Sequence, residues 1–179
     1  MIKKELTKRI FSSLILIPIV LFVVTEGSFL FNFFVLICFL IASYEWHMMS
    51  RKKSYYFLGF FFLFFSFYSA YQIRTNVIDG YEYFLIILLI CISTDIGGYI
   101  FGNFFKGPKL TKISPKKTYS GVIGGYLLSI LLMYLSLNSN FIFEKFYEIT
   151  LSIFIFIILI STVSQLGDIV ISYFKRLSK

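Results

Sequence analysis

The sequence predicts an all-α integral membrane protein, a polytopic bundle of about six transmembrane helices with both termini in the cytoplasm. Composition is the first observation, since 58% of the 179 residues are hydrophobic and 15% are charged. The mean hydropathy of +0.84 far exceeds that of a water-soluble domain. The second observation is a series of apolar stretches of about the length that a helix needs to cross a bilayer. The third is that basic residues gather in alternate loops. These features exclude a soluble enzyme, a disordered chain and a disulfide scaffold.

The apolar segments justify the expected helices one by one. Their approximate ranges are 10–24, 29–44, 55–71, 83–101, 119–137 and 149–173. The first could pass for a cleavable signal peptide, but no small-residue cleavage site follows it, so we expect an uncleaved anchor. The next two are rich in aromatic residues and chemically bland. We therefore expect an N-terminal scaffold of three spans over residues 1–82 and a catalytic-type region over residues 83–179.

The charge pattern indicates the orientation in the membrane. With a cytoplasmic N-terminus, 15 of the 17 lysine and arginine residues fall on the cytoplasmic side, and only Arg74 and Lys145 fall on the other. This is the positive-inside distribution of a membrane protein. Adding or removing one span would invert the later loops and destroy the pattern. The net charge of +8 therefore reports topology, and no nucleic-acid partner is expected.

Two carboxylates lie inside apolar segments, near the expected cytoplasmic ends. They are Asp95 in the fourth segment and Asp168 in the sixth. A charged side chain at the centre of a bilayer costs roughly 2.5 to 3.5 kcal/mol on insertion scales, so such residues normally face a bundle interior or a wet cavity. Two of them at the same depth suggest one shared polar cavity. The plainer alternative is that each only caps a helix or makes a hydrogen bond near its end.

The sixth segment also carries a hydrophilic face. Helical spacing places along it Ser164, Asp168, Ser172 and either Lys175 or Arg176, with Gln165 alongside. Carboxylate, amide and hydroxyl oxygens are hard ligands that suit Mg²⁺, which proteins usually hold through one or two carboxylates together with substrate phosphates. This face therefore predicts contact with a divalent cation or a phosphate.

A basic loop over residues 102–118 joins the fourth and fifth segments. It contains five lysines and no acidic residue. Its last five residues run from Ser114 to Thr118 with the sequence Ser-Pro-Lys-Lys-Thr, so hydroxyl groups, ammonium groups and the N–H groups of a helix start would converge on an anion. An ordinary positive-inside loop would explain the lysines but not this arrangement.

These residues fall into three blocks that resemble the phosphatidate cytidylyltransferases, the integral membrane CDP-diacylglycerol synthases. The resemblance runs from about residue 95 to residue 176. The blocks are Asp95-x-Gly97-Gly98-Tyr99-x-x-Gly102 followed by Lys109-Leu110, then Ser114-Pro115-Lys116-Lys117-Thr118-x-x-Gly121-x-x-Gly124-Gly125, and finally Ser164-Gln165-x-Gly167-Asp168-x-x-x-Ser172-x-x-Lys175-Arg176. The resemblance implies transfer of a cytidylyl group from CTP to phosphatidic acid, giving CDP-diacylglycerol and pyrophosphate. It also implies a requirement for Mg²⁺ or another divalent cation, and a multi-pass protein of a bacterial inner membrane with its site facing the cytoplasm.

The resemblance also assigns roles to residues of this chain. Asp168 would hold the metal, and Lys116, Lys117 and Lys175 would complete the catalytic group. The remaining substrate-binding residues would be Ser114, Thr118, Lys112, Gln165, Ser172, Arg176 and Asp95. Because phosphatidic acid is already ionised at neutral pH, no strong general base is expected.

Two departures from the family pattern leave alternatives open. Ser120 stands where the family usually has an acidic residue, and the family continues past its Lys-Arg pair with a second metal-binding aspartate that has no counterpart before Lys179. We therefore expect a cytidylyltransferase shortened at its C-terminus. The alternative is a catalytically incomplete membrane protein that binds lipid or nucleotide, with a homodimer or a complementing polypeptide as its partner. A small ion transporter is disfavoured, because a cation pathway would not place five lysines at its mouth.

Overall fold

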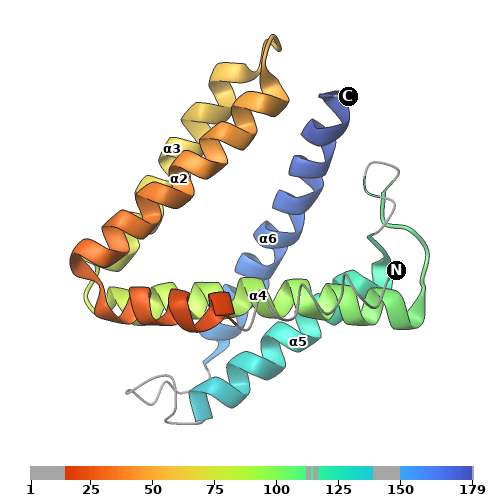
Figure 1. The fold of residues 1–179 in the computed structure, drawn as a ribbon. Helices are drawn as coiled ribbons and strands as arrows, with labels where there is room; N and C mark the ends of the chain where they lie inside the picture. The colour runs from red at the N-terminus through yellow and green to blue at the C-terminus, as the bar shows by residue number, and fades with distance from the viewer. Residues whose placement is uncertain (1–14, 112–113, 115–116, 139–149, 179) are drawn as a thin grey trace. The chain divides into compact units, whose positions relative to one another are not determined.

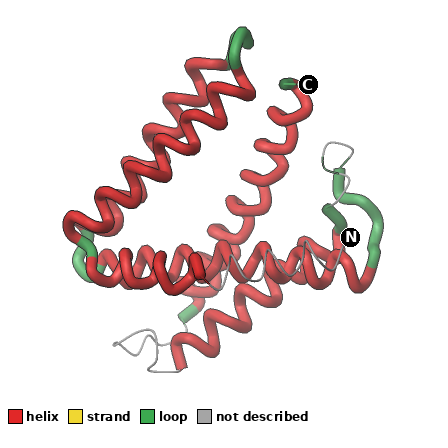
Figure 2. The backbone as a smooth tube through the Cα atoms, viewed as in Figure 1, coloured by secondary structure: helices red, strands yellow, loops and turns green. Residues whose placement is uncertain are grey.

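The computed structural model describes residues 15–111, 114, 117–138 and 150–178. The chain divides into two compact units, Met1–Leu85 and Ile86–Lys179, whereas the division expected from the sequence falls after residue 82. Helices dominate the described residues, which contain no strand (Figure 2). One isolated antiparallel bridge joins Lys109 and Thr118.

Within the described residues, five helices are long and apolar enough to cross a membrane. They are α2 (Ser28–Ser50), α3 (Tyr56–Asn76), α4 (Gly80–Phe105), α5 (Tyr119–Asn138) and α6 (Leu151–Leu177), labelled in Figure 1. A shorter apolar helix, Ile15–Glu26, precedes them. The predicted all-α, multi-span fold class is confirmed. The first expected span begins among residues 1–14, outside the described residues.

The first unit is built on a hairpin of α2 and α3, which run side by side (Figure 1). Trp46 near the end of α2 donates a hydrogen bond from Nε1 to the backbone oxygen of Tyr56, at 2.9 Å. Nδ1 of His47 lies 2.8 Å from the hydroxyl oxygen of the same tyrosine. The Trp46 ring lies against Gly59, in the space that a Cβ atom would need. The glycine therefore allows the indole to close the hairpin.

Arg74 near the end of α3 ties the Ile15–Glu26 helix to the hairpin. Its Nε donates to the backbone oxygen of Val24 at 2.8 Å, where a cation also interacts favourably with the helix dipole. The guanidinium lies over the rings of Phe31 and Tyr81, 5.8 Å from each centroid, in cation–π geometry. The sequence indicates only that Arg74 is one of two basic residues on the expected non-cytoplasmic side. The structure shows that it also packs the helices of this unit together.

The contact between Gly59 and Trp46 predicts that a larger residue at position 59 lowers stability, and the fluorescence of Trp46 can report the change. Gly59→Ala would place a methyl group inside the Trp46 ring, so the indole must leave its site. Overpacking of this kind costs about 1–3 kcal/mol. We expect a lower thermal midpoint in detergent and altered emission of Trp46, the one tryptophan of the chain.

Ser66→Ala is the matched control on the same helix. Ser66 is exposed, and its hydroxyl only donates to the backbone oxygen of Phe62, so a change within about 0.5 kcal/mol is expected. Unchanged emission and midpoint in Gly59→Ala would contradict the packing described for Trp46.

The boundary between the units falls within α4, so the second unit consists of α4 from Ile86 onward together with α5 and α6. Glycines let the backbones of α4 and α5 touch: a Cβ atom on Gly97 would meet the Gly124 carbonyl group, and one on Gly121 would lie 2.8 Å from the Gly98 oxygen. Small residues permit this close approach between membrane helices. A buried hydrogen bond of 2.9 Å between the hydroxyl groups of Thr94 and Ser161 joins α4 to α6.

Candidate active site

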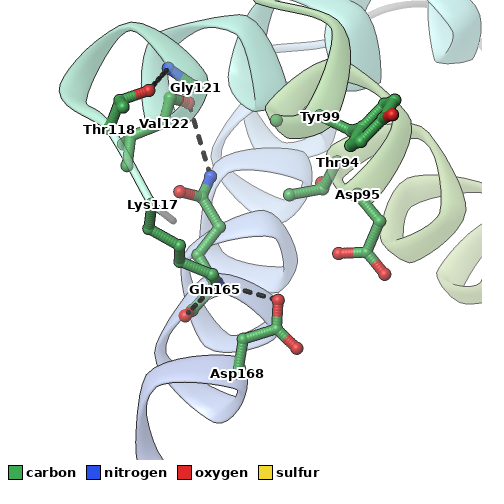
Figure 3. Close-up of a pocket in the computed structure, with 10 residues that line it drawn as sticks. Thr94, Asp95, Tyr99, Lys117, Thr118, Gly121, Val122, Gln165 and Asp168 are labelled. Carbon is green, nitrogen blue, oxygen red and sulfur yellow. Dashed lines mark hydrogen bonds and ion pairs between the residues drawn. The ribbon is translucent and has the colours of Figure 1, made fainter. Parts of the chain in front are cut away.

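One pocket of the second unit gathers residues from all three of its helices. It is lined by Thr94, Asp95, Gly98 and Tyr99 of α4, by Lys117, Thr118, Gly121 and Val122 at the start of α5, and by Gln165 and Asp168 of α6 (Figure 3). Its volume is about 180 Å³, below the roughly 300–1,000 Å³ of pockets that enclose a drug-sized ligand. The pocket therefore suits a phosphate group with a cation rather than a whole nucleoside triphosphate.

An ion pair links the basic loop to α6 across this pocket. Nζ of Lys117 lies 2.8 Å from Oδ2 of Asp168 and donates a second hydrogen bond, of 3.1 Å, to the backbone oxygen of Gln165. The Lys117 side chain is 24% exposed and that of Asp168 is 53% exposed, so the pair lies at the open side of the pocket.

The backbone of Lys117 is held by other residues of its own loop. Its N–H donates to the Ser114 oxygen at 3.0 Å, and its carbonyl oxygen accepts from the Leu110 N–H at 2.8 Å. The neighbouring bridge between Lys109 and Thr118 continues this pairing. The loop thus fixes the Lys117 backbone at the pocket, while its side chain spans the distance to α6.

Thr118 caps the start of α5. Its Oγ1 accepts a hydrogen bond of 3.1 Å from the Gly121 N–H, as an N-cap threonine does. The Tyr119 N–H donates to the Pro108 oxygen at 3.1 Å. These two amides of the helix start are therefore engaged within the protein, and side chains rather than these amides must meet an anion here. Ser120, at a position where the family resemblance implies an acidic residue, pairs with Thr118 through a 3.0 Å hydroxyl contact and does not line the pocket.

The side chain of Gln165 packs against Gly125 of α5, which has no side chain of its own. Its Nε2 would lie 3.2 Å from a Cβ atom on Gly125, and it donates weakly to the Val122 oxygen at 3.5 Å. A second contact, of 3.4 Å, reaches the hydroxyl of Ser161 one turn earlier on α6. Gln165 therefore holds α6 against α5 directly beside Asp168.

Two carboxylates face each other in the pocket. Asp95 on α4 and Asp168 on α6 both turn toward the space between their helices (Figure 3). Tyr99 and Thr94 also line the pocket but were not among the expected site residues. Tyr99 follows Asp95 by four residues, so helical spacing alone places both on one face and could have identified it.

The structure separates the expected site residues into three groups. It brings together Asp95, Lys117, Thr118, Gln165 and Asp168. Four expected residues lie outside the pocket: Ser114, Ser172, Lys175 and Arg176. Ser172 donates its hydroxyl to the Asp168 backbone oxygen at 2.7 Å. Lys175 and Arg176 are exposed and lie about one helical turn beyond Ser172. Lys112 and Lys116 lie outside the described residues.

Comparison with known proteins identifies the family. The sequence model of the cytidylyltransferase family matches residues 53–179, a range that includes every residue of the pocket. The chain belongs to the cytidylyltransferase family. The predicted family resemblance is thereby confirmed.

Relatives of this cytidylyltransferase-family chain carry a more specific name. A phosphatidate cytidylyltransferase of Rickettsia bellii is 34% identical over 181 residues, covering 97% of this chain and 77% of the relative. One of Rickettsia conorii is 45% identical over 98 residues, covering 51% of this chain and 42% of the relative. One of Staphylococcus haemolyticus is 39% identical over 104 residues, covering 55% of this chain and 36% of the relative. In the last two matches, the chain spans less than half of the relative's length. No solved structure matches the chain.

The donor set of this family member suits a hard divalent cation shared with substrate. Among the described residues, no group of three or more histidine, cysteine, aspartate and glutamate side chains is arranged to hold a metal. Two carboxylates line the pocket, which matches the usual binding of Mg²⁺ through one or two carboxylates plus substrate phosphates. The described residues therefore do not supply a complete set of metal ligands by themselves.

Proposed function

We propose that this chain transfers a cytidylyl group from CTP to phosphatidic acid, giving CDP-diacylglycerol and pyrophosphate. The observation that carries the proposal is the meeting of Lys117 with Asp168 and Asp95 in one pocket of apolar helices. The Rickettsia bellii relative, named for this reaction and aligned with 97% of this chain, adds support.

The reaction brings two polyanions together. A phosphate oxygen of phosphatidic acid attacks the α-phosphorus of CTP, a new P–O bond forms, and the bond from the α-phosphorus to the bridging oxygen breaks as pyrophosphate leaves. Fixed positive charge is needed to offset the repulsion and the charge that develops on the leaving group. Lys117 is the described cation that lines the pocket. It would contact a phosphate oxygen, with Thr118 as the adjacent hydroxyl.

Mg²⁺ or another divalent cation would be held by Asp168, with Asp95 facing it from α4. When bound, such a cation polarises phosphoryl oxygens and neutralises charge. Asp168 and Asp95 would set its position, because they come from two helices tied together by the buried hydrogen bond between Thr94 and Ser161. The chain would thus use a rigid helix contact to orient carboxylates, and a loop lysine to orient phosphate.

The pocket is proposed to open toward the cytoplasm from a bacterial inner membrane, with both termini on that side. Support comes from the 15 of 17 basic residues that this orientation places in the cytoplasm. CTP would then reach the pocket from water, while phosphatidic acid would reach it from the surrounding leaflet.

The test is transfer of radiolabel by the purified chain in detergent. With phosphatidic acid and Mg²⁺ present, label from the α-phosphate of CTP should enter the lipid, whereas label from the γ-phosphate should appear in pyrophosphate. Omission of phosphatidic acid or addition of a chelator should abolish both. A folded, monodisperse chain that forms no labelled lipid would contradict catalysis by this chain alone and favour the lipid- or nucleotide-binding alternative.

Asp95→Asn tests the second carboxylate. The variant keeps the size of the side chain but removes its charge from the pocket, so we expect about a 10- to 100-fold rise in the Mg²⁺ concentration for half-maximal transfer. Glu45→Gln, an isosteric change at an exposed carboxylate of α2, is the control and should match the wild type. An unchanged Mg²⁺ dependence in Asp95→Asn would remove Asp95 from the metal site.

A further inference from the structure

The ion pair of Lys117 with Asp168 poses a competition at the carboxylate proposed to hold the metal. The ammonium lies 2.8 Å from Oδ2 of Asp168, so that oxygen already has a cationic partner. Mg²⁺ binds oxygen ligands at about 2.0–2.1 Å. A divalent cation and an ammonium group on one carboxylate oxygen would lie close together and repel each other.

The geometry lets Lys117 release Asp168 without any change of fold. Hydrogen bonds to Ser114 and Leu110 hold its backbone, and these do not involve the side chain. Beyond Asp168, the ammonium contacts the backbone oxygen of Gln165 at 3.1 Å, which is an uncharged acceptor. The side chain can therefore turn toward a stronger anion in the pocket while the loop stays in place.

The charges of the pocket favour a coupled exchange. Among the described lining residues, the carboxylates of Asp95 and Asp168 and the ammonium of Lys117 leave one negative charge uncompensated. A divalent cation alone would have to displace Lys117 and leave its ammonium without an anion. A phosphate alone would draw Lys117 away and leave two carboxylates facing each other. With both ligands present, the ammonium has the phosphate as its partner and the two carboxylates have the divalent cation.

We propose that Lys117 is a counter-ion switch, whose ammonium neutralises Asp168 until a phosphate group in the same pocket takes over that ammonium and frees Asp168 for a divalent cation. This inference rests on the proposed function, because it assigns the metal to Asp168 and the phosphate to substrate. Its consequence is positive coupling: phosphate raises the affinity for the cation, and by thermodynamic linkage the cation raises the affinity for phosphate to the same extent.

The test measures Mn²⁺ binding to the purified full chain by electron paramagnetic resonance, without turnover. The difference between wild type and Asp168→Asn isolates the Asp168-dependent component. Lys117→Gln should raise that Mn²⁺ affinity by about 5- to 100-fold, because the competing ammonium is gone. Lys117→Arg, which keeps the charge, should bind no more tightly than wild type. Lys53→Gln, which removes an exposed lysine of the first unit, should leave the affinity unchanged.

A second arm includes a readout on the wild-type protein, which does not depend on the folding of a Lys117 variant. Millimolar inorganic phosphate should raise the Asp168-dependent Mn²⁺ affinity of the wild type at least about fivefold, and should not raise it in Lys117→Gln. Wild-type affinity that phosphate leaves unchanged, or Lys117→Gln affinity at or below that of wild type, would overturn the switch. These readouts do not depend on activity. If the chain transfers label but its Mn²⁺ affinity does not respond to the change at Lys117, the switch is refuted and the proposed reaction is not. Coupled Mn²⁺ and phosphate binding without label transfer would refute only the proposed reaction.

Discussion

Asp168→Asn is expected to cause a severe loss of cytidylyl transfer by the folded protein. Asparagine keeps the size of the side chain but removes its charge, and with it the proposed metal ligand and the anionic partner of Lys117. Loss of one charge-stabilising group in an active site lowers kcat by on the order of 10²–10³-fold. Radiolabel transfer from the α-phosphate of CTP, measured over a range of Mg²⁺ concentrations, checks this expectation.

The fold should survive this change. Ser172 donates to the backbone oxygen of Asp168 rather than to its carboxylate, and the contacts of Gln165 that hold α6 against α5 do not involve Asp168. The thermal midpoint in detergent should therefore stay close to that of Glu45→Gln, the control used for Asp95. Transfer within threefold of wild type in Asp168→Asn would rule out a metal-binding role for this aspartate.

Gly97→Ala is expected to have the largest effect on the second unit. An added Cβ atom would meet the Gly124 carbonyl group and lie 2.9 Å from the Leu128 Cβ atom. These neighbours are backbone and near-backbone atoms, which cannot turn aside as a side-chain tip can. Separation of α4 from α5 should cost about 1–3 kcal/mol. It should also lower label transfer, because these helices form two walls of the pocket.

Gly167→Ala supplies the matched control for this change. Nothing lies within 4 Å of the position that a Cβ atom on Gly167 would occupy, and alanine favours a helix interior over glycine by roughly 0.5–1 kcal/mol. The thermal midpoint should therefore stay level or rise in Gly167→Ala and fall in Gly97→Ala. Equal midpoints for the two variants would disprove the tight contact between α4 and α5.

The membrane fold could be predicted because it depends on local properties of the chain. Hydropathy over a run of about 20 residues specifies a spanning helix wherever its neighbours lie. The cost of a charge among apolar residues likewise identified Asp95 and Asp168 without any knowledge of their contacts. The loop lysines and the Ser114–Thr118 block indicated phosphate chemistry by residue type alone.

Pairwise contacts could not be predicted in this way. Lys117 contacts Asp168 although the two residues are 51 positions apart in the sequence. Helical spacing along α6 gave no reason to expect Lys117, rather than Lys175 or Arg176, as the partner of Asp168. Glycines such as those of α4 and α5 permit close helix packing in general, but the sequence does not say which carbonyl group each one faces. Helix-start amides near Thr118 were expected to meet an anion, yet the Gly121 and Tyr119 amides bond to Thr118 and Pro108.

The distinction has a physical basis. The bilayer acts on each segment separately, so composition and spacing along the chain suffice to predict spans, polar faces and the kinds of ligand that their side chains suit. An ion pair or a backbone contact depends on which surfaces of different helices meet, and that follows from packing summed over the whole unit. The residues proposed to bind phosphate and a cation can therefore be identified from the sequence. The pairing of Lys117 with Asp168, on which the proposed competition with a metal depends, arises only when α4, α5 and α6 come together.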